Sequence, residues 1–138
     1  MVREETLQMI NAIPSLDSLL EESKKVLAPY AKEVKFAFLF GSYAAGTADN
    51  WSDLDVGIYF SPEVSDEKRT EIRFALMDAL EPLETQIGYL DDEDMAPEIF
   101  IAASEGVPIA MNDVEAYNEA LMKKIHALEE MKLIGLIG

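Results

Sequence analysis

The chain has 138 residues, of which 49% are hydrophobic and none is cysteine, so one soluble globular domain without disulfides or thiolate metal sites is expected. No apolar run approaches the roughly 20 residues of a membrane span, and the N-terminus lacks the pattern of a signal peptide, so we expect a single cytoplasmic domain over residues 1–138. Its 27 acidic residues against 11 Lys and Arg give a net charge of −16, which disfavours direct nucleic-acid binding through phosphate contacts and favours a basic protein partner.

N-terminal helices are expected over about residues 2–31. The first runs through about residues 2–12 and stops before Pro14, because proline lacks the amide that a helix interior needs. The second begins after Ser15, a favourable N-cap residue, and carries leucines at near-helical spacing. Pro29 is expected to end or kink this second helix.

Four segments are expected to form one β-sheet. Each is a short apolar run bounded by glycine, proline or polar residues. They are Val34–Phe40, Leu54–Phe60, Glu84–Leu90 and Val107–Met111. The first is apolar at nearly every position, which is typical of a buried strand. Shortly after it, a short helix is expected to begin at Tyr43.

Three further helices are expected between and after these strands. The first covers about residues 65–81. The second covers about residues 97–105, with Gly106 as its C-cap. The last covers about residues 113–132 and begins at a capping box that starts with Asn112. The whole pattern predicts a small α/β (α+β) domain, in which one sheet has helices packed mainly on one side.

Two polar features are interpreted as surface features. The acidic segment Asp91–Asp94 has the composition of a metal site, but a solvated loop is the better interpretation. His126, the only histidine, lies on the polar side of the predicted last helix.

Gly41 and Ser42 begin the segment that carries the chemistry. A buried strand leads directly into Gly41, where the absence of a Cβ lets a ligand approach the backbone. Ser42 adds a hydroxyl donor. A helix beginning just after it would offer unpaired N–H groups and a positive dipole end, which suit a phosphate.

Asp53 and Asp55 stand at the start of the next strand. Residues two apart in a strand point to the same face, so the two carboxylates project together while Leu54 turns into the core. Adjacent carboxylates repel each other unless a cation lies between them, and oxygen ligands completed by substrate phosphates suit Mg²⁺. A phosphate cradle beside such a metal site is the minimum equipment for phosphoryl-type transfer.

In this order and spacing, these residues resemble the signature of the DNA polymerase β-like nucleotidyltransferase superfamily. The residues that carry the resemblance are Gly41, Ser42, Gly46, Ser52, Asp53 and Asp55. The short chain is similar to the minimal members of that superfamily, the MNT domains that pair with HEPN-domain proteins. The likeness covers about residues 34–111.

The resemblance implies a polymerase β palm-like fold, which is a small mixed sheet flanked by helices. It implies transfer of a nucleoside monophosphate, with AMP as the first expectation, from an NTP such as ATP to a hydroxyl group. Gly41, Ser42, Gly46 and Ser52 would bind the nucleotide, and Asp53 and Asp55 would bind two Mg²⁺ ions. The implied partner is a HEPN-type ribonuclease toxin, to which this chain would be the antitoxin.

The sequence departs from the superfamily at the third carboxylate, which active members carry on the following strand. Aligning that strand places Gln86 at the position, and an amide cannot act as a base near neutral pH. Glu84 lies on the same strand face two residues earlier and is the alternative third catalytic residue if the register differs. In addition, Ala45 stands where many relatives carry Arg or Gln.

Two other interpretations stay open. In one, the chain is a non-catalytic module that neutralises its partner by contact, and Gln86 marks the lost reaction. In the other, the acceptor is a small molecule, although enzymes of that kind usually need a further domain. The net charge of −16 fits a basic partner but does not demonstrate one, because strong acidity also serves solubility.

Overall fold

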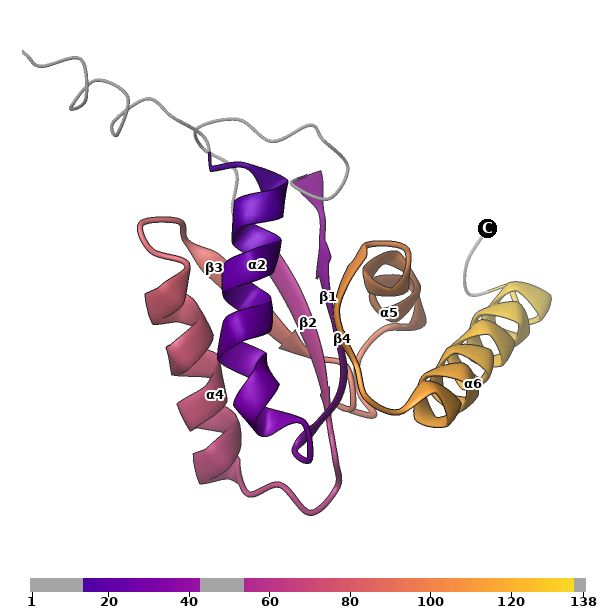
Figure 1. Ribbon diagram of the computed structural model, residues 1–138. Helices are drawn as coiled ribbons and strands as arrows, with labels where there is room; N and C mark the ends of the chain where they lie inside the picture. Colours follow the sequence, from indigo (N-terminus) through magenta and orange to yellow (C-terminus); the bar gives the residue numbers. More distant parts are fainter. Residues whose placement is uncertain (1–13, 43–53, 136–138) are drawn as a thin grey trace, which may run out of the picture.

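The computed structural model describes residues 14–42 and 54–135. Its elements are, in chain order, α2 (Leu16–Leu27), the 3₁₀ turn η1 (Ala28–Tyr30), β1 (Val34–Phe40), β2 (Leu54–Phe60), α4 (Asp66–Ala79), β3 (Thr85–Tyr89), α5 (Pro97–Ser104), β4 (Val107–Met111) and α6 (Val114–Leu133) (Figure 1). The predicted helices at residues 2–12 and after Tyr43 lie outside the described residues. Across the described ranges, no helix combines the length and the apolar character that crossing a membrane would require.

The four predicted strands are confirmed, and they form one mixed sheet in the order β3-β2-β1-β4. β1 pairs antiparallel with β2 and β4, whereas β2 pairs parallel with β3. β1 therefore has a partner along each edge, and most of its side chains are buried. The sequence of β1 is apolar at nearly every position because a polar side chain on either face of this central strand would be buried away from water.

Helices cover both faces of the sheet, so the prediction that they pack mainly on one side is wrong. α2 and α4 lie on one face, and α5 and α6 lie on the other (Figure 1). The alternation of side chains along β1 explains this arrangement. Ala37 and Leu39 belong to the core under α2 and α4, while Phe36 and Phe38 belong to the cluster under α5 and α6. Both faces of the sheet are apolar, and both must be shielded from water.

Polar side chains cap three helix starts. Ser15 and Ser65 each accept a hydrogen bond from the backbone amide three residues ahead, at 3.1 Å, which confirms the predicted cap at Ser15. Helix α6 is capped by Asp113 at 2.9 Å, so the predicted cap at Asn112 is wrong by one residue. The side-chain amide of Asn112 instead donates to the backbone carbonyl of Val34 at 2.8 Å and joins the end of β4 to the start of β1.

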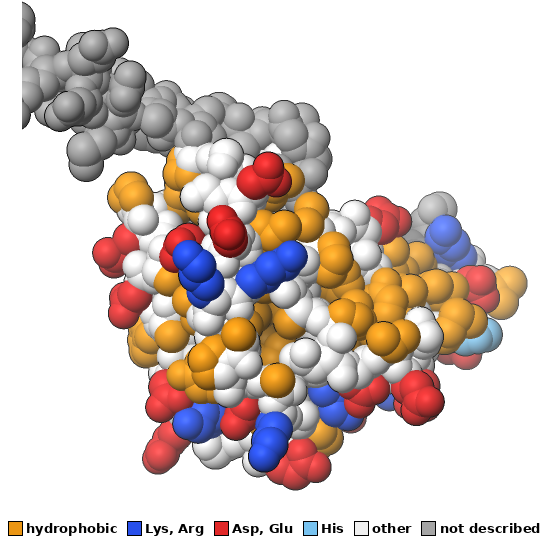
Figure 2. All heavy atoms as spheres, in the orientation of Figure 1, with side chains coloured by type: hydrophobic (Ala, Val, Ile, Leu, Met, Phe, Trp, Pro, Cys, Tyr) orange, Lys and Arg blue, Asp and Glu red, His pale blue; other side chains and the backbone are white. Residues whose placement is uncertain are grey.

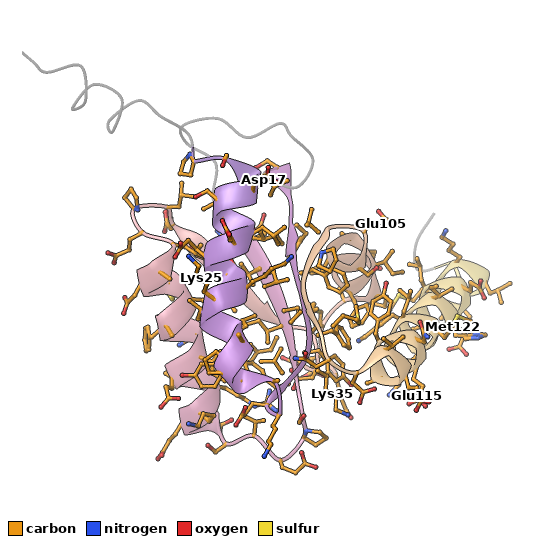
Figure 3. The ribbon with its side chains drawn as sticks, in the orientation of Figure 1. Asp17, Lys25, Lys35, Glu105, Glu115 and Met122 are labelled. Carbon is orange, nitrogen blue, oxygen red and sulfur yellow. The ribbon has the colours of Figure 1, made fainter. Side chains whose placement is uncertain are left out.

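Gly106 is not a left-handed helix cap, which corrects the prediction made for it. The C-cap of α5 is Glu105, and Gly106 has no positive φ. A Cβ on Gly106 would instead overlap the carbonyl oxygen of Leu39. Glycine is needed because β1 passes directly against this residue. The contact holds the end of α5, marked by Glu105 in Figure 3, at the end of the sheet where β1 finishes.

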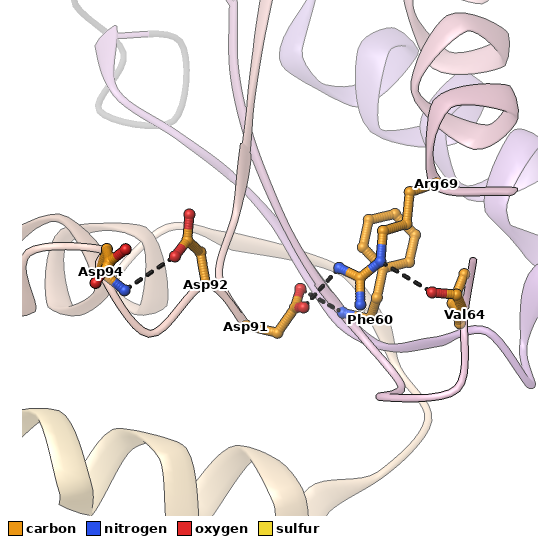
Figure 4. Close-up of polar contacts among 6 residues, drawn as sticks. All are labelled: Phe60, Val64, Arg69, Asp91, Asp92 and Asp94. Carbon is orange, nitrogen blue, oxygen red and sulfur yellow. Dashed lines mark hydrogen bonds and ion pairs between the residues drawn. The ribbon is translucent and has the colours of Figure 1, made fainter. Parts of the chain in front are cut away.

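Asp91 does not belong to a solvated loop, which corrects that part of the prediction. Its Oδ2 accepts a hydrogen bond from Arg69 at 2.6 Å and its Oδ1 accepts one from the amide of Phe60 at 3.0 Å (Figure 4). The two charged side chains are only 14% and 15% exposed. The other three residues of the acidic segment are exposed as predicted, and so is His126.

Candidate functional site

Three strands have neighbouring ends at one end of the sheet. β1 finishes there at Phe40, while β2 and β3 begin there. Phe40 is in register with Asp55 on one side of β2, and Asp55 is in register with Gln86 on the other. Asp55 therefore lies in the middle of this row of strand ends, one residue into β2.

Gly41 follows β1 directly and meets the carboxylate of Asp55. Its φ is +82°, in the region that L side chains rarely adopt. A Cβ on Gly41 would overlap Oδ2 of Asp55. The backbone at the start of the loop and the carboxylate on β2 are thus close together because glycine leaves the space. The next residue, Ser42, is partly exposed at the same place.

The two faces of β2 separate the polar side chain from the core. Leu54 and Val56 are fully buried among the residues under α2 and α4. Asp55 stands between them in the strand and so points to the opposite face, where it is partly exposed. The prediction that Leu54 turns into the core is confirmed.

Gln86 and Glu84 lie on the neighbouring strand. Gln86 is exposed and in register with Asp55, and in a parallel pair such neighbours point to the same face. Glu84 stands just before β3, and its carbonyl accepts a hydrogen bond from the amide of Leu54 at 2.9 Å. Its backbone therefore lies beside the start of β2, and its side chain is exposed.

Several predicted site residues lie outside the described residues. They are Gly46, Ser52 and Asp53. Of the predicted set, the structure describes Gly41, Ser42, Asp55 and Glu84. It brings Gly41 into contact with Asp55, and it leaves Glu84 at the edge of the same end of the sheet.

The oxygen atoms at this end of the sheet fit a hard cation. Asp55 carries a carboxylate, and Gln86 beside it carries an amide oxygen; both are ligand types that Mg²⁺ accepts. Within residues 14–42 and 54–135, no three His, Asp or Glu side chains are grouped as a metal site. The second predicted carboxylate ligand, Asp53, falls between those ranges.

A groove between α6 and the segment that follows β3 was not predicted from the sequence. It has a volume of about 830 Å³, and its lining residues come from β2, α5, α6 and the segment after β3. No local sequence pattern could mark it, because these residues are far apart in the chain. The aromatic side chain of Tyr59, on the same face of β2 as Asp55, forms part of its lining.

Comparison with known proteins gives a family and a fold. The family model described as "Polymerase beta, Nucleotidyltransferase" matches residues 21–115. A chain of a toxin–antitoxin crystal structure with AMP-PNP matches with a TM-score of 0.63 and 20% identity, over 83% of this chain and 94% of that chain. A chain of the tri-AMPylated Shewanella oneidensis HEPN toxin in complex with MNT antitoxin matches with a TM-score of 0.57 and 16% identity, over 84% of this chain and 92% of that chain. No curated protein matches the sequence.

Proposed function

Because the chain belongs to the polymerase beta nucleotidyltransferase family, we propose that it transfers a nucleoside monophosphate, first of all AMP, from an NTP to a hydroxyl group with release of pyrophosphate. The observation that carries the proposal is the contact between Gly41 and Asp55. It holds the start of the loop after β1 against a carboxylate at the end of the same sheet. Phosphoryl-type transfer depends mainly on such positioning and on charge neutralisation.

In this proposal the nucleotide binds at the end of β1. The carboxylate of Asp55 fills the space beside Gly41 that has no Cβ, so the triphosphate would lie next to this carboxylate at the start of the loop. Ser42 would donate a hydrogen bond from its hydroxyl group. Gly46 and Ser52 complete the nucleotide site by resemblance to the superfamily. One relative of this fold is a toxin–antitoxin structure with AMP-PNP, which supports an adenine nucleotide as the donor.

Asp53 and Asp55 would hold Mg²⁺, with two ions in the active form that the resemblance implies. Bound there, Mg²⁺ would neutralise charge on the triphosphate and on the reacting oxygens. The chain itself would orient the triphosphate against Gly41. Gln86, not Glu84, is in register with Asp55. Glu84 is still the proposed third carboxylate, because its backbone lies beside the start of β2, and it would accept the proton of the attacking hydroxyl.

The proposed acceptor is a protein of the HEPN type, with this chain as its antitoxin. The similar structures include an AMP-modified HEPN toxin bound to an MNT antitoxin, and a MntA-HepT toxin–antitoxin complex. The net charge of −16 is consistent with a basic partner, because opposite surface charges speed association and fix orientation.

A second candidate function is neutralisation by contact without transfer. The observation that favours it is Gln86, which stands in register with Asp55 where a catalytic carboxylate would complete the site. An amide can coordinate a cation through its carbonyl oxygen but cannot accept a proton near neutral pH. In that case the nucleotide site would remain and the reaction would be weak or lost.

Intact-mass analysis of the co-expressed partner, after incubation with ATP and Mg²⁺, tests the transfer. Wild type is compared with Asp55→Asn, which keeps the shape of the side chain and removes its charge. Asp17→Asn is the matched control, because Asp17 is an exposed carboxylate on α2 at the same end of the molecule (Figure 3). We expect a gain of one or more AMP groups with wild type and with Asp17→Asn, and no gain with Asp55→Asn. No gain in any sample, with the complex intact, would support the contact mechanism instead.

A further inference from the structure

The groove beside α6 has an apolar interior. Its volume is about 830 Å³. The occupant to compare with this volume is the recognition face of a helix, which presents three or four side chains at i, i+3 or i+4 and i+7. Tyr59 and Met95 line it from the sheet side, and Ala120, Ala127 and Met131 line it from α6. Because the side chains of the two alanines are short, the groove beside α6 has space for the side chains of another molecule.

Within residues 14–42 and 54–135, no other helix or strand of the chain contributes a buried cluster against the second half of α6. The helix has 20 residues, whereas α5, on which it packs, has 8. The cluster under α5 and α6 includes Ala116, Tyr117, Ala120 and Leu121, and no α6 residue after them. Among the described residues, no side chain of α6 is fully buried. Figures 1 and 2 show α6 extending beyond the sheet, with hydrophobic side chains gathered over the α5 and α6 side.

The rim of the groove is acidic. Asp92, Glu93, Asp94 and Glu98 are exposed along the side opposite α6. In the part of the chain that the structure describes, none of these four carboxylates makes an ion pair. α6 contributes two lysines to the lining, and one of them, Lys124, already donates to the carbonyl of Met95 at 3.0 Å. The charge of the rim therefore favours a cationic occupant.

We propose that this groove docks an amphipathic helix of a partner protein, whose apolar face enters between α6 and the segment after β3 and whose Lys and Arg side chains meet the acidic rim. An apolar groove with charged edges is the recognised setting for helix-in-groove binding. A second copy of this chain is disfavoured as the occupant, because each copy carries a net charge of −16.

The position of the groove relates it to the candidate site. Tyr59 and Asp55 lie on the same face of β2, four residues or about 13 Å apart along the strand. Leu90 covers Gly57 between them, so a protein held in the groove would lie outside this cover, on the side of the sheet that Asp55 faces. The docking surface adds to the proposed function the place where the protein acceptor binds. Only this link to the acceptor rests on the proposed function; the docking of a helix in the groove does not.

The test uses a fluorescent peptide of about 18 residues, with Leu and Lys at helical spacing, and an otherwise identical peptide with Glu in place of Lys. Fluorescence anisotropy measures their affinity for the full chain. We expect the Leu/Lys peptide to bind and the Leu/Glu peptide not to bind. Ala127→Phe fills the groove without changing the charge and should abolish binding. Asp92→Asn/Glu93→Gln/Asp94→Asn should weaken it about ten-fold, as three partly screened ion pairs would.

The matched control is Glu21→Gln/Glu63→Gln/Glu67→Gln, which removes three exposed charges outside the groove. We expect it to leave peptide affinity within a factor of about two. Equal weakening in both triple variants would overturn the proposal, since net charge alone would then explain binding. So would the absence of binding by either peptide. A wild-type dimer in sedimentation equilibrium that Ala127→Phe converts to monomer would identify a second copy as the occupant and would also overturn it.

Circular dichroism of each variant establishes that its helix content equals that of wild type. Failure of docking and failure of the proposed function remain distinguishable. Loss of AMP transfer in Asp55→Asn with peptide binding intact concerns only the reaction site. AMP transfer by wild type without peptide binding would overturn only the proposal that the groove docks a helix.

Discussion

Oδ2 of Asp55 occupies the space where a Cβ on Gly41 would lie. Gly41 also has a φ of +82°, so two independent constraints, backbone conformation and occupied space, restrict this position to glycine. The expectation that this glycine opens the backbone to a ligand is corrected, because the carboxylate of Asp55 fills the space. Glycine is needed here because it lets the loop after β1 leave the sheet across the carboxylate of β2.

We expect Gly41→Ala to lower the free energy of unfolding by about 2–4 kcal/mol, because the left-handed conformation and the overlap with Asp55 each cost about 1–2 kcal/mol. Gly135→Ala is the matched control. Gly135 has a φ of +75°, but no atom of the described residues lies within 4 Å of the position of its Cβ, so only the conformational cost of about 1–2 kcal/mol applies. Urea denaturation measures both variants. Equal losses would show that Asp55 does not constrain position 41.

Arg69→Ala is expected to destabilise the fold by about 3–5 kcal/mol, because it leaves the largely buried carboxylate of Asp91 without its charged partner. The pair joins the start of α4 to the segment after β3 at 2.6 Å, and Arg69 also lies over the ring of Phe60 at 4.9 Å. Lys68→Ala removes the neighbouring, exposed ion pair with Glu71 and should change stability little. Thermal and urea denaturation of the two variants provide the comparison. Similar stabilities for both would contradict the structural role given to Arg69.

Much of the fold could be predicted because its signals are local. The apolar run of β1 predicts a buried strand, and Ser15 predicts a helix start. The errors arose where a contact joins distant residues. The partner of Asp91 is 22 residues away, and the neighbour of Gly106 is a carbonyl of β1. The covering of both faces likewise depends on where the helices pack, which their own sequences do not state.

The candidate site divides in the same way. The spacing that begins at Gly41 and ends at Asp55 is a sequence pattern, so the motif could be recognised without a structure. That Asp55 contacts Gly41, and that Gln86 is its parallel neighbour, depends on strand pairing. The groove beside α6 escaped prediction entirely, because it exists only when three separate parts of the chain come together.

Glu84→Gln tests whether Glu84 is the third catalytic carboxylate. If Glu84 accepts the proton of the acceptor hydroxyl, its amide variant should lower the rate of AMP transfer about 10²-fold or more, which is the usual contribution of a general base. Nucleotide affinity should change little. The double variant Glu84→Gln/Gln86→Glu moves the carboxylate to the position in register with Asp55 and should recover part of the rate. An unchanged rate in Glu84→Gln would remove Glu84 from the mechanism.

The raised pKa of the Tyr59 hydroxyl predicts a loss of folding stability at alkaline pH. Burial raises its pKa above the usual 10.0, and the negative charges of Asp91, Glu119 and Glu93 act in the same direction. The folded protein therefore keeps this proton when the unfolded chain has released it. The resulting stabilisation is full below about pH 10 and is lost as the pH rises through the higher pKa of the folded state. Denaturation of wild type and Tyr59→Phe between pH 8 and pH 11 measures it, and equal slopes would contradict the prediction.

Isothermal titration calorimetry with AMP-PNP, with and without Mg²⁺, tests the central claim most directly, because it reports nucleotide binding whether or not transfer occurs. The samples are wild type, Asp55→Asn and the control Asp17→Asn. We predict Mg²⁺-dependent binding by wild type and by Asp17→Asn, and its loss in Asp55→Asn. Equal affinity in all three proteins, or affinity that does not depend on Mg²⁺, would contradict a nucleotide site built on Gly41 and Asp55.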